Sequence, residues 1–479
     1  MDMNLYCNNF FKKIRNYLSP QVCLVFLVIG WMVGMWMVKY DLLNKSYLTS
    51  DIALYSNIFW NTNFYDKFLY SDFIFHWHGY SSYLFEHFSP TLLLFAPLYH
   101  LFPSPEFLIF IEVLMGGITG CLIYYYSKII TKNSWVSIIF VAAFLFHPSF
   151  IAATIDGVSG FRHDCFIPPL IILLAIFFVR SKNKLFFITL IPLLGLKENL
   201  PLIGLLLGGY LIIKKDYKKI GLYIFFISVL YLMFGLVLLP YFSGVHNIVA
   251  SGMVHSLLTL DFPILANLWE FKKWLILFLL FPGILAPEIL FLTLPDLLMF
   301  YISTDSPLDN NVFTPLVIFL VAAVVGYQRF SEGKIKFFSS TKIETRKIII
   351  ASCLALSVFF YLVGDFYLYK RHLFIENYMV NLVSTTKNQR DYVEKNIPRE
   401  AVLMTSGDLL VHFSNRLHLL WPAQSVDKAE YFLINTTASH DSIGDNNLSV
   451  ELGSMYKLGE ISEVVSVGNL KLFKNLVTK

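Results

Sequence analysis

Residues 22–38 read VCLVFLVIGWMVGMWMV, a run with no charged or amide side chain. Lys12, Lys13 and Arg15 precede it, and Lys39-Tyr40-Asp41 follows it in place of a small-residue cleavage site. Basic residues ahead of a long apolar run that is not cleaved are typical of a first membrane span with a cytoplasmic N-terminus. This stretch therefore predicts a membrane protein.

The composition of the whole chain agrees with that prediction. Of 479 residues, 56% are hydrophobic and 15% charged, and the mean hydropathy is +0.61. A soluble domain carries about 25% charged residues, so too little polar surface is present to cover a water-soluble globule. The net charge of +4 is small and dispersed, and nucleic acid is not an expected partner.

The five cysteines have no metal-ligand spacing, which favours buried small side chains over a zinc site or a disulfide framework. They are Cys7, Cys23, Cys121, Cys165 and Cys353. Phosphate-binding glycine loops and the HExxH and GxSxG motifs are absent from the sequence. ATP-driven transport by this chain alone is therefore not expected.

Further apolar segments follow the first, and several are shorter than the roughly 20 residues of a straight span. They lie at 106–126, 135–150, 166–180, 185–196, 200–213, 220–241, 274–286, 288–303, 313–327 and 347–367. Lysines at 182, 184, 214 and 215 flank 185–213 on both sides, so this region is predicted to enter and return as a hairpin with residues 197–199 at its outer tip. A second turn is predicted near Pro287-Glu288, which brings the total to about eleven segments.

The predicted fold is mainly α, a polytopic helical bundle with a small extracytoplasmic α/β domain at its C-terminal end. The membrane domain covers 1–367 and includes a long outer loop, 39–105, in which Pro90–Phe102 suits an interfacial or re-entrant helix. The outer domain covers 368–479, with a helix over Phe374–Asn396. Its strand candidates are Ala401–Thr405, Leu417–Trp421, Tyr431–Asn435 and Leu470–Phe473.

Polar side chains gather where apolar segments meet the outer side. The candidates are Asp51, His87, Asp156, Arg162, His163, Asp164, Lys197 and Glu198. A charge at such a position costs roughly 2.5–3.5 kcal/mol on insertion scales, so several on one face indicate a site.

Each candidate also has a structural interpretation. Asp51 could cap a helix beginning at Ile52. His87 could be an interfacial side chain with a satisfied hydrogen bond. Arg162 could reach the headgroups, and Lys197 and Glu198 could neutralise each other at a turn.

The chain resembles a family of prokaryotic polytopic membrane proteins catalogued as domain of unknown function 2079. The resemblance rests on an ordered series of motifs over nearly the whole chain. These are Asp51 with Trp60-Asn61-Thr62, His87-Phe88-Ser89-Pro90, Ala96-Pro97-Leu98-Tyr99, His147-Pro148, Pro168-Pro169-Leu170, Lys197-Glu198-Asn199 and Leu294-Pro295-Asp296. The chain departs from the family pattern at Phe161-Arg162-His163-Asp164 and at Asp309-Asn310-Asn311-Val312.

The family's architecture is similar to that of GT-C-like integral-membrane glycosyltransferases, which use lipid-phosphate sugar donors. That likeness implies transfer of a sugar from a polyprenyl phosphate at the outer face, with membrane lipids and the lipid-linked donor as partners. Asp51 is predicted as the base, with Glu198 or Asp156 in reserve. Lys197, Arg162, His163 and His87 are predicted to bind the leaving phosphate and the substrate, together with Asn61.

No cofactor is required by this scheme, although a divalent metal could share the charge of the phosphate. Two other functions remain open, and only the first would use the same residues. A transporter or flippase would bind a lipid-linked or polar solute at broken helices. A non-catalytic scaffold would bind partners through its C-terminal region.

Overall fold

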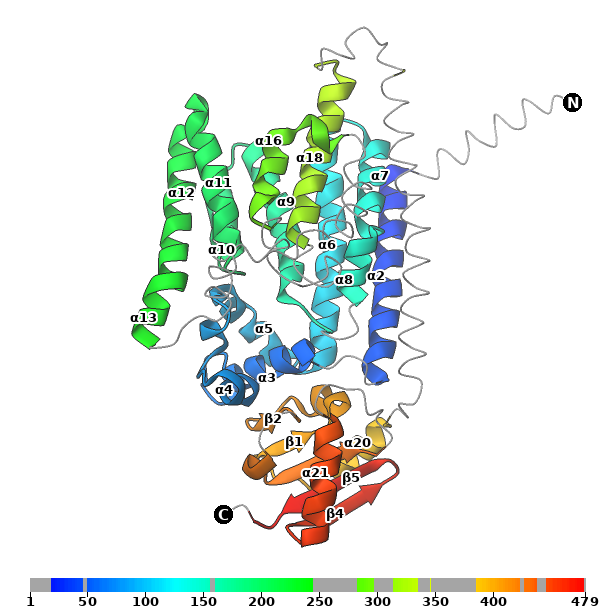
Figure 1. Ribbon diagram of the computed structural model, residues 1–479. Helices are drawn as coiled ribbons and strands as arrows, with labels where there is room; N and C mark the ends of the chain where they lie inside the picture. The colour runs from blue at the N-terminus through cyan, green and yellow to red at the C-terminus, as the bar shows by residue number, and fades with distance from the viewer. Residues whose placement is uncertain are drawn as a thin grey trace, which may run out of the picture.

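The computed structural model describes residues 19–45, 50–155, 160–243, 282–296, 313–334, 345, 385–422, 426–436 and 445–477. In this part of the chain, a bundle of upright helices stands on a layer of short helices, and a small mixed sheet lies beyond that layer (Figure 1). The predicted fold, a mainly α bundle with a C-terminal α/β unit, is confirmed.

Four of the described helices are long and apolar enough to cross a membrane: α2 (Pro20–Asn44), α6 (Pro105–Thr131), the continuous helix Lys215–Tyr241 and α18 (Phe313–Ser331). A bent pair, α7 (Ser134–Leu145) and α8 (Pro148–Ile155), would make a fifth. Pro148 explains this bend, because the residue before a proline avoids the helical conformation. Segment 347–367 and parts of 274–286 and 288–303 lie outside the described residues, so the predicted total is not tested.

Three apolar helices are shorter: α9 (Ile167–Val179), α10 (Asn183–Leu194) and α11 (Leu200–Ile213). At 1.5 Å per residue, α11 is about 21 Å long, against about 30 Å for the hydrocarbon core. The predicted hairpin is therefore present as α10 and α11, neither of which is long enough to span by itself.

The tip of this hairpin, residues 195–199, stops inside the length of its neighbour. Helix α11 packs along α12 (Lys218–Met233), with Gly204 against Ser228 and Gly208 against the backbone of Phe225. In that antiparallel register the tip is level with the π-helical turn η5 (Phe234–Leu238), ahead of α13 (Leu239–Ser243). The hairpin tip therefore stops short of the end of the neighbouring span.

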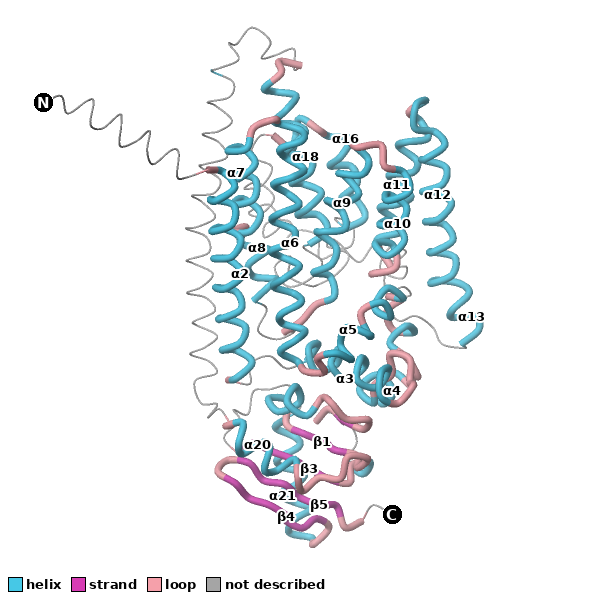
Figure 2. Tube along the Cα trace, turned by 180° about the vertical axis from the view of Figure 1, so that it is seen from behind, coloured by secondary structure: helices cyan, strands magenta, loops and turns pink. Residues whose placement is uncertain are grey.

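The first long loop folds into the layer of short helices beneath the bundle (Figure 2). Its elements are α3 (Ser50–Phe64), α4 (Asp72–His78), η1 (Tyr83–Phe85), η2 (Pro90–Leu94) and α5 (Ala96–Leu101). Thr91 joins this layer to the hairpin tip, because its N–H donates to Gly195 O at 3.0 Å and its hydroxyl to Pro192 O at 2.8 Å. These carbonyls belong to the last turn of α10, which lacks partners of its own.

The C-terminal unit is a five-stranded sheet in the order β2-β1-β3-β5-β4. Its elements are α20 (Lys387–Glu394), β1 (Leu403–Thr405), η9 (Gly407–Phe413), β2 (Leu419–Leu420), η10 (Val426–Lys428), β3 (Tyr431–Asn435), α21 (Asp445–Leu458), β4 (Ile461–Val467) and β5 (Leu470–Asn475). β1 is parallel to β2 and β3, whereas β5 is antiparallel to β3 and β4. The four predicted strands are confirmed, and the sequence analysis missed β4 and α21.

The two faces of the sheet are buried differently, as the alternation of strand side chains requires. Leu403, Leu433 and Leu472 belong to the hydrophobic core that also contains Ile52 of α3 and Leu108 of α6. The opposite face carries Met404, Phe432 and Phe473, which pack with Leu448 and Leu452 of α21. The sheet and the membrane helices thus share one core. Of the predicted helix Phe374–Asn396, residues before 385 lie outside the described residues.

Candidate functional site

The hairpin tip brings together predicted site residues from three distant segments. His87 Nδ1 lies 3.0 Å from Glu198 Oε1, and Lys197 Nζ lies 2.9 Å from Asp164 Oδ2. Glu198 and Asp164 are buried, whereas His87 and Lys197 are partly exposed. We call His87, His163, Asp164, Lys197 and Glu198, with Asn199 beside them, the tip cluster.

His163 connects this cluster to α3. Its Nε2 lies 3.0 Å from Leu196 O and its Nδ1 lies 2.6 Å from the Tyr55 hydroxyl, which is also 2.8 Å from the hydroxyl of Tyr83. Because a carbonyl only accepts, Nε2 must carry a proton, and in the neutral ring Nδ1 then accepts from Tyr55. A continuous hydrogen-bonded path therefore runs from Tyr83 to the hairpin tip.

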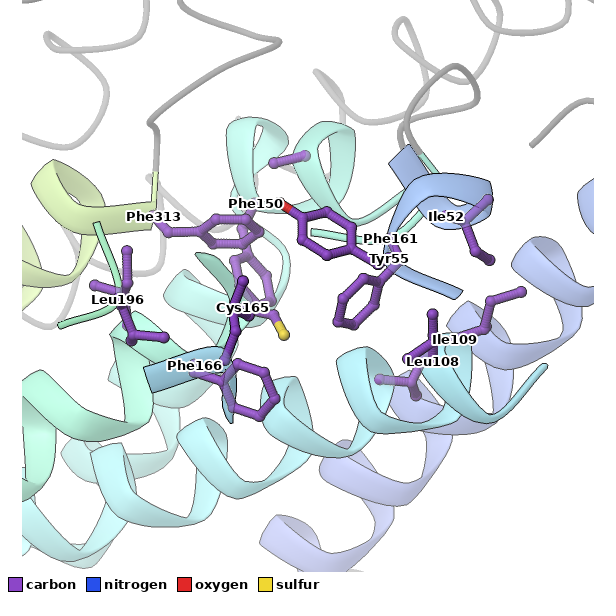
Figure 3. Close-up of a cluster of buried hydrophobic side chains, with 14 of the residues drawn as sticks. Ile52, Tyr55, Leu108, Ile109, Phe150, Phe161, Cys165, Phe166, Leu196 and Phe313 are labelled. Atoms are coloured by element: carbon purple, nitrogen blue, oxygen red, sulfur yellow. The ribbon is translucent and has the colours of Figure 1, made fainter. Parts of the chain in front are cut away.

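Apolar packing fixes Tyr55 in this position. The rings of Tyr55 and Phe161 meet edge to face, with centroids 5.3 Å apart. Figure 3 shows Tyr55 and Phe161 in a buried cluster with Ile52 of α3, Leu108 and Ile109 of α6 and Cys165. The phenol is thus held by surrounding side chains before any substrate arrives.

Asp51 lies at the start of α3, in its first turn, and is half-buried. It precedes Tyr55 by four residues, which places the two side chains on one helix face. Burial raises the pKa of the Tyr55 hydroxyl, and the nearby charge of Asp51 raises it further. The carboxylate is therefore close enough to act on the tyrosine pair.

The His87 and Glu198 pair, in the loop and turn between helices, is electrostatically coupled. Burial by itself would raise the pKa of Glu198, but the charge and hydrogen bond of His87, with Lys197, lower it to about 2. Burial likewise lowers the pKa of His87, but the charge and hydrogen bond of Glu198, together with the charge of Glu86, raise it, and the net direction is upward. Each partner thus favours the charged form of the other.

Asn199 adds a second polar contact on the other side of the tip. Its Nδ2 donates to Asp296 Oδ1 at 2.6 Å, and both side chains are buried. The sequence analysis named Asp164 among the outer polar residues without giving it a role, and it did not include Tyr55, Tyr83, Asn199 or Asp296 among the candidate site residues. The Lys197-Glu198-Asn199 and Leu294-Pro295-Asp296 motifs were the signals for Asn199 and Asp296.

The remaining predicted residues lie elsewhere or outside the description. Asn61 is buried at the contact with the C-terminal unit, with Nδ2 3.1 Å from Tyr70 O and 3.5 Å from Leu417 O. Its role in substrate binding stays a prediction. Arg162 is half-buried, and its charge acts on neighbouring Asp164. Asp156 lies outside the described residues.

A second buried ion pair lies within the bundle. Lys39 of α2 contacts the Glu112 carboxylate of α6 and donates to Thr154 O of α8 at 2.6 Å. Both side chains are almost fully buried. Among the described residues, no group of three or more His, Cys, Asp or Glu side chains could hold a metal ion.

The comparisons with known proteins concern the whole chain. A solved structure of ArnT from Cupriavidus metallidurans, bound to undecaprenyl phosphate, is similar with a TM-score of 0.45 and 11% sequence identity, over 95% of this chain and 98% of that one. A likeness at this level says nothing of activity. No curated protein matches the sequence. The model of the family described as "Predicted membrane protein (DUF2079)" matches residues 39–456. The chain therefore belongs to the DUF2079 family of predicted membrane proteins.

Proposed function

We propose that this membrane protein is a glycosyltransferase that moves a sugar from a polyprenyl-phosphate donor to an acceptor hydroxyl. The observation that carries the proposal is the tip cluster, where two carboxylates, a lysine and two histidines meet at a hairpin that stops short of the full span. Ionisable side chains at such depth are costly, and they mark functional sites more often than structural ones.

Asp51 is the base in this proposal. Inverting transfer forms a bond from the acceptor oxygen to the anomeric carbon, releases the acceptor proton to a carboxylate and lets the phosphate leave with the electron pair of the broken bond. Glu198 has a pKa of about 2, because His87 and Lys197 outweigh the effect of burial, and so it is a weak base. Half-buried Asp51 is better suited, and Asp156 remains in reserve.

The leaving phosphate needs positive charge and hydrogen-bond donors. Lys197 and Arg162 are the proposed cations and His87 is the proposed donor, whereas His163, whose two ring nitrogens bond Leu196 O and the Tyr55 hydroxyl, positions the hairpin tip. Lys197 is already oriented by Asp164 at 2.9 Å, and His163 by Tyr55 at 2.6 Å, so neither has to be ordered during the reaction. A divalent metal could share the charge, and EDTA treatment of purified protein separates the two schemes.

We place the N-terminus in the cytoplasm, and the hairpin tip and the C-terminal unit on the extracytoplasmic side. The distribution of lysine and arginine supports this orientation. An alkaline phosphatase fused after residue 479 should be active, since that enzyme folds only outside the cytoplasm. An inactive fusion that is made in normal amounts would reverse the orientation and move the site to the cytoplasmic face.

Lipid and glycan mass spectrometry tests the proposed reaction. Cells lacking the protein are compared with cells that express the wild type, Asp51→Asn or a control, Asp391→Asn, which changes an exposed residue of α20. A sugar-sized mass difference should be reversed by the wild type and by Asp391→Asn, but not by Asp51→Asn at equal protein level.

The other outcomes decide between the remaining functions. If Asp51→Asn restores the glycoconjugate fully, Asp51 is not the base. If no glycoconjugate changes, proteoliposomes are tested for flipping or uptake without covalent change, which would indicate a transporter. If neither occurs, loss of bound partners on removal of residues 376–479 would indicate a scaffold.

A further inference from the structure

The hairpin tip contains buried oxygen atoms for which the described residues provide no hydrogen-bond donor. They are Asp164 Oδ1, Glu198 Oε2, Asn199 Oδ1 and Asp296 Oδ2. All four side chains are at least nine-tenths buried. Native proteins leave few buried polar atoms unpaired, because the lost hydration is not replaced. Four acceptors without donors in one place therefore point to a missing partner.

These atoms belong to one constellation. Glu198 and Asn199 are adjacent in the chain, Asn199 donates to Asp296, and Lys197 donates to Asp164. The charges of Lys197 and Asp164 both act on Asp296. The side chains of His87 and Lys197 keep 27% and 18% of their surface exposed, so the constellation is not sealed from its surroundings.

Asp164 Oδ1, Glu198 Oε2 and Asn199 Oδ1 accept, and Asp296 Oδ2 accepts when its carboxyl group is ionised, so the missing partner must supply hydrogen atoms. Asp164 Oδ1 is 3.5 Å from His163 Nε2, but that nitrogen already donates to Leu196 O. Three of the four unpaired oxygens belong to the carboxyl groups of Asp164, Glu198 and Asp296, so a sugar carboxylate placed against them would meet like charge. Glu198 and Asn199 place acceptors on the turn itself, and Asp164 and Asp296 place two more beside it, an arrangement that matches hydroxyl groups spaced around a sugar ring.

We propose that Asp164, Glu198, Asn199 and Asp296 form the sugar subsite, which accepts hydrogen bonds from the hydroxyl or amino groups of a neutral or amino sugar and rejects a uronic acid. This inference rests on the proposed function and adds to it the class of sugar. It also gives a role to Asn199 and Asp296, which have no part in the proposed reaction.

Binding measured separately from transfer tests the subsite. The full-length protein in nanodiscs is titrated with a short-chain polyprenyl phosphate, either bare or linked to glucose, galactose, mannose, N-acetylglucosamine, a 4-amino-pentose or glucuronic acid. At least one neutral or amino sugar should raise affinity about tenfold over the bare lipid, because several buried acceptors gain donors. The glucuronic acid form should bind no better than the bare lipid.

Deoxy analogues of the preferred sugar link individual hydroxyl groups to individual residues. Removing the hydroxyl that meets Asp296 should weaken binding about tenfold in the wild type. The same removal should have little effect in Asp296→Asn, which replaces the unpaired oxygen with an amide donor. Asp408→Asn is the matched control, since Asp408 is equally buried but has a donor on each oxygen, Ser406 at 2.6 Å and Asn435 at 2.8 Å.

Three results overturn the subsite. One is equal affinity for the bare lipid and every sugar-linked form, and a second is a deoxy effect of equal size in the wild type and Asp296→Asn. The third is a sugar preference that EDTA abolishes and Mg²⁺ restores, which would assign the oxygens to a cation. Sugar-dependent binding without transfer would keep the subsite and defeat the proposed reaction, so the two failures are distinguishable.

Discussion

The side-chain amide of Asn57, in α3, donates to the carbonyl oxygen of Arg416 at 2.7 Å. The same amide donates to Ser414 O at 2.9 Å, and Asn57 is fully buried. Nearby, the Tyr99 hydroxyl donates to Asn415 Oδ1 at 2.7 Å, and Asn415 Nδ2 donates to Pro103 O at 2.7 Å. These hydrogen bonds connect the helix that carries Asp51 and Tyr55 to the loop between η9 and β2.

Asn57→Ala should destabilise the contact between α3 and the C-terminal unit. The substitution leaves two buried carbonyl oxygens without that donor, and we expect a loss of about 2–4 kcal/mol in the free energy of unfolding. Thermal unfolding in detergent and protease sensitivity of the 414–418 loop measure the effect. Asn396→Ala, which removes an exposed amide bonded to Tyr392 O, should cost under about 0.5 kcal/mol. Equal losses in the two variants would contradict a stabilising role for the Asn57 hydrogen bonds to the loop.

The stability lost in Glu198→Gln should depend on pH. The raised pKa of His87 contributes to the stability of the folded state. This stabilisation is fully present below the pKa of histidine in the unfolded chain, and it is lost as the pH rises through the pKa of His87 in the folded protein. The lowered pKa of Glu198 also stabilises the folded state. This stabilisation is present above the pKa of glutamate in the unfolded chain, and it is lost as the pH falls towards 2.

The difference in melting temperature between wild type and Glu198→Gln should therefore be largest near pH 5–6 and smaller at pH 9. We expect about 1–3 kcal/mol at its maximum. Glu451→Gln, at an exposed position of α21, serves as the control, and its difference should stay flat. A Glu198→Gln difference that grows with pH would contradict the ion pair.

Lys39→Ala should be among the most damaging substitutions in the bundle. It leaves the Glu112 charge buried without its lysine, at a cost of about 3–5 kcal/mol. The double variant Lys39→Met with Glu112→Leu should recover most of that loss, which a double-mutant cycle on thermal unfolding measures. Lys45→Ala breaks an exposed pair with Asp41 in the same helix and should cost under about 1 kcal/mol. Purely additive losses in the cycle would exclude a coupled pair.

Gly208→Ala should disrupt the packing of α11 on α12. An added methyl group would lie 2.7 Å from Phe225 N and 2.9 Å from Gly221 O, and backbone atoms cannot move aside as a side chain can. We expect a loss of about 1–3 kcal/mol. At the next residue a methyl group would meet nothing within 4 Å, so Gly209→Ala should be neutral or stabilising by up to about 1 kcal/mol. A lower melting temperature for Gly209→Ala than for Gly208→Ala would contradict this packing register of α11 on α12.

Apolar runs and the charges that flank them predicted much of the helical bundle. The runs at 22–38, 106–126 and 313–327 appear as α2, α6 and α18, and the flanking lysines predicted the α10–α11 hairpin. These features depend on local composition and on the cost of burying charge, both of which can be seen in one segment. The α21 helix and β4 were missed because few of their described side chains are buried, so little apolar periodicity marks them in the sequence.

Details of the site depended on contacts that no local pattern reveals. Lys39 resembles a residue flanking a span, yet α2 continues to Asn44 and Lys39 meets Glu112, 73 residues away. Tyr55 and Tyr83 resemble interfacial aromatic residues, and only the fold links the Tyr83 hydroxyl to Tyr55 and the Tyr55 hydroxyl to His163. Asn61 lies within the Trp60-Asn61-Thr62 motif, but its side-chain amide contacts the carbonyl oxygen of Leu417, 356 residues further along the chain.

The strand order has a consequence for biosynthesis. β5 is the last strand in the chain, yet it lies between β3 and β4 and pairs with both. The sheet cannot close until residue 475 has emerged from the ribosome, long after α3 and the α10–α11 hairpin have been made. Because one face of that sheet completes the core around α3, the layer that carries Asp51 and Tyr55 matures only after translation of the C-terminal unit. A ribosome that stalls within β4 would therefore leave membrane helices in place around an unfinished site.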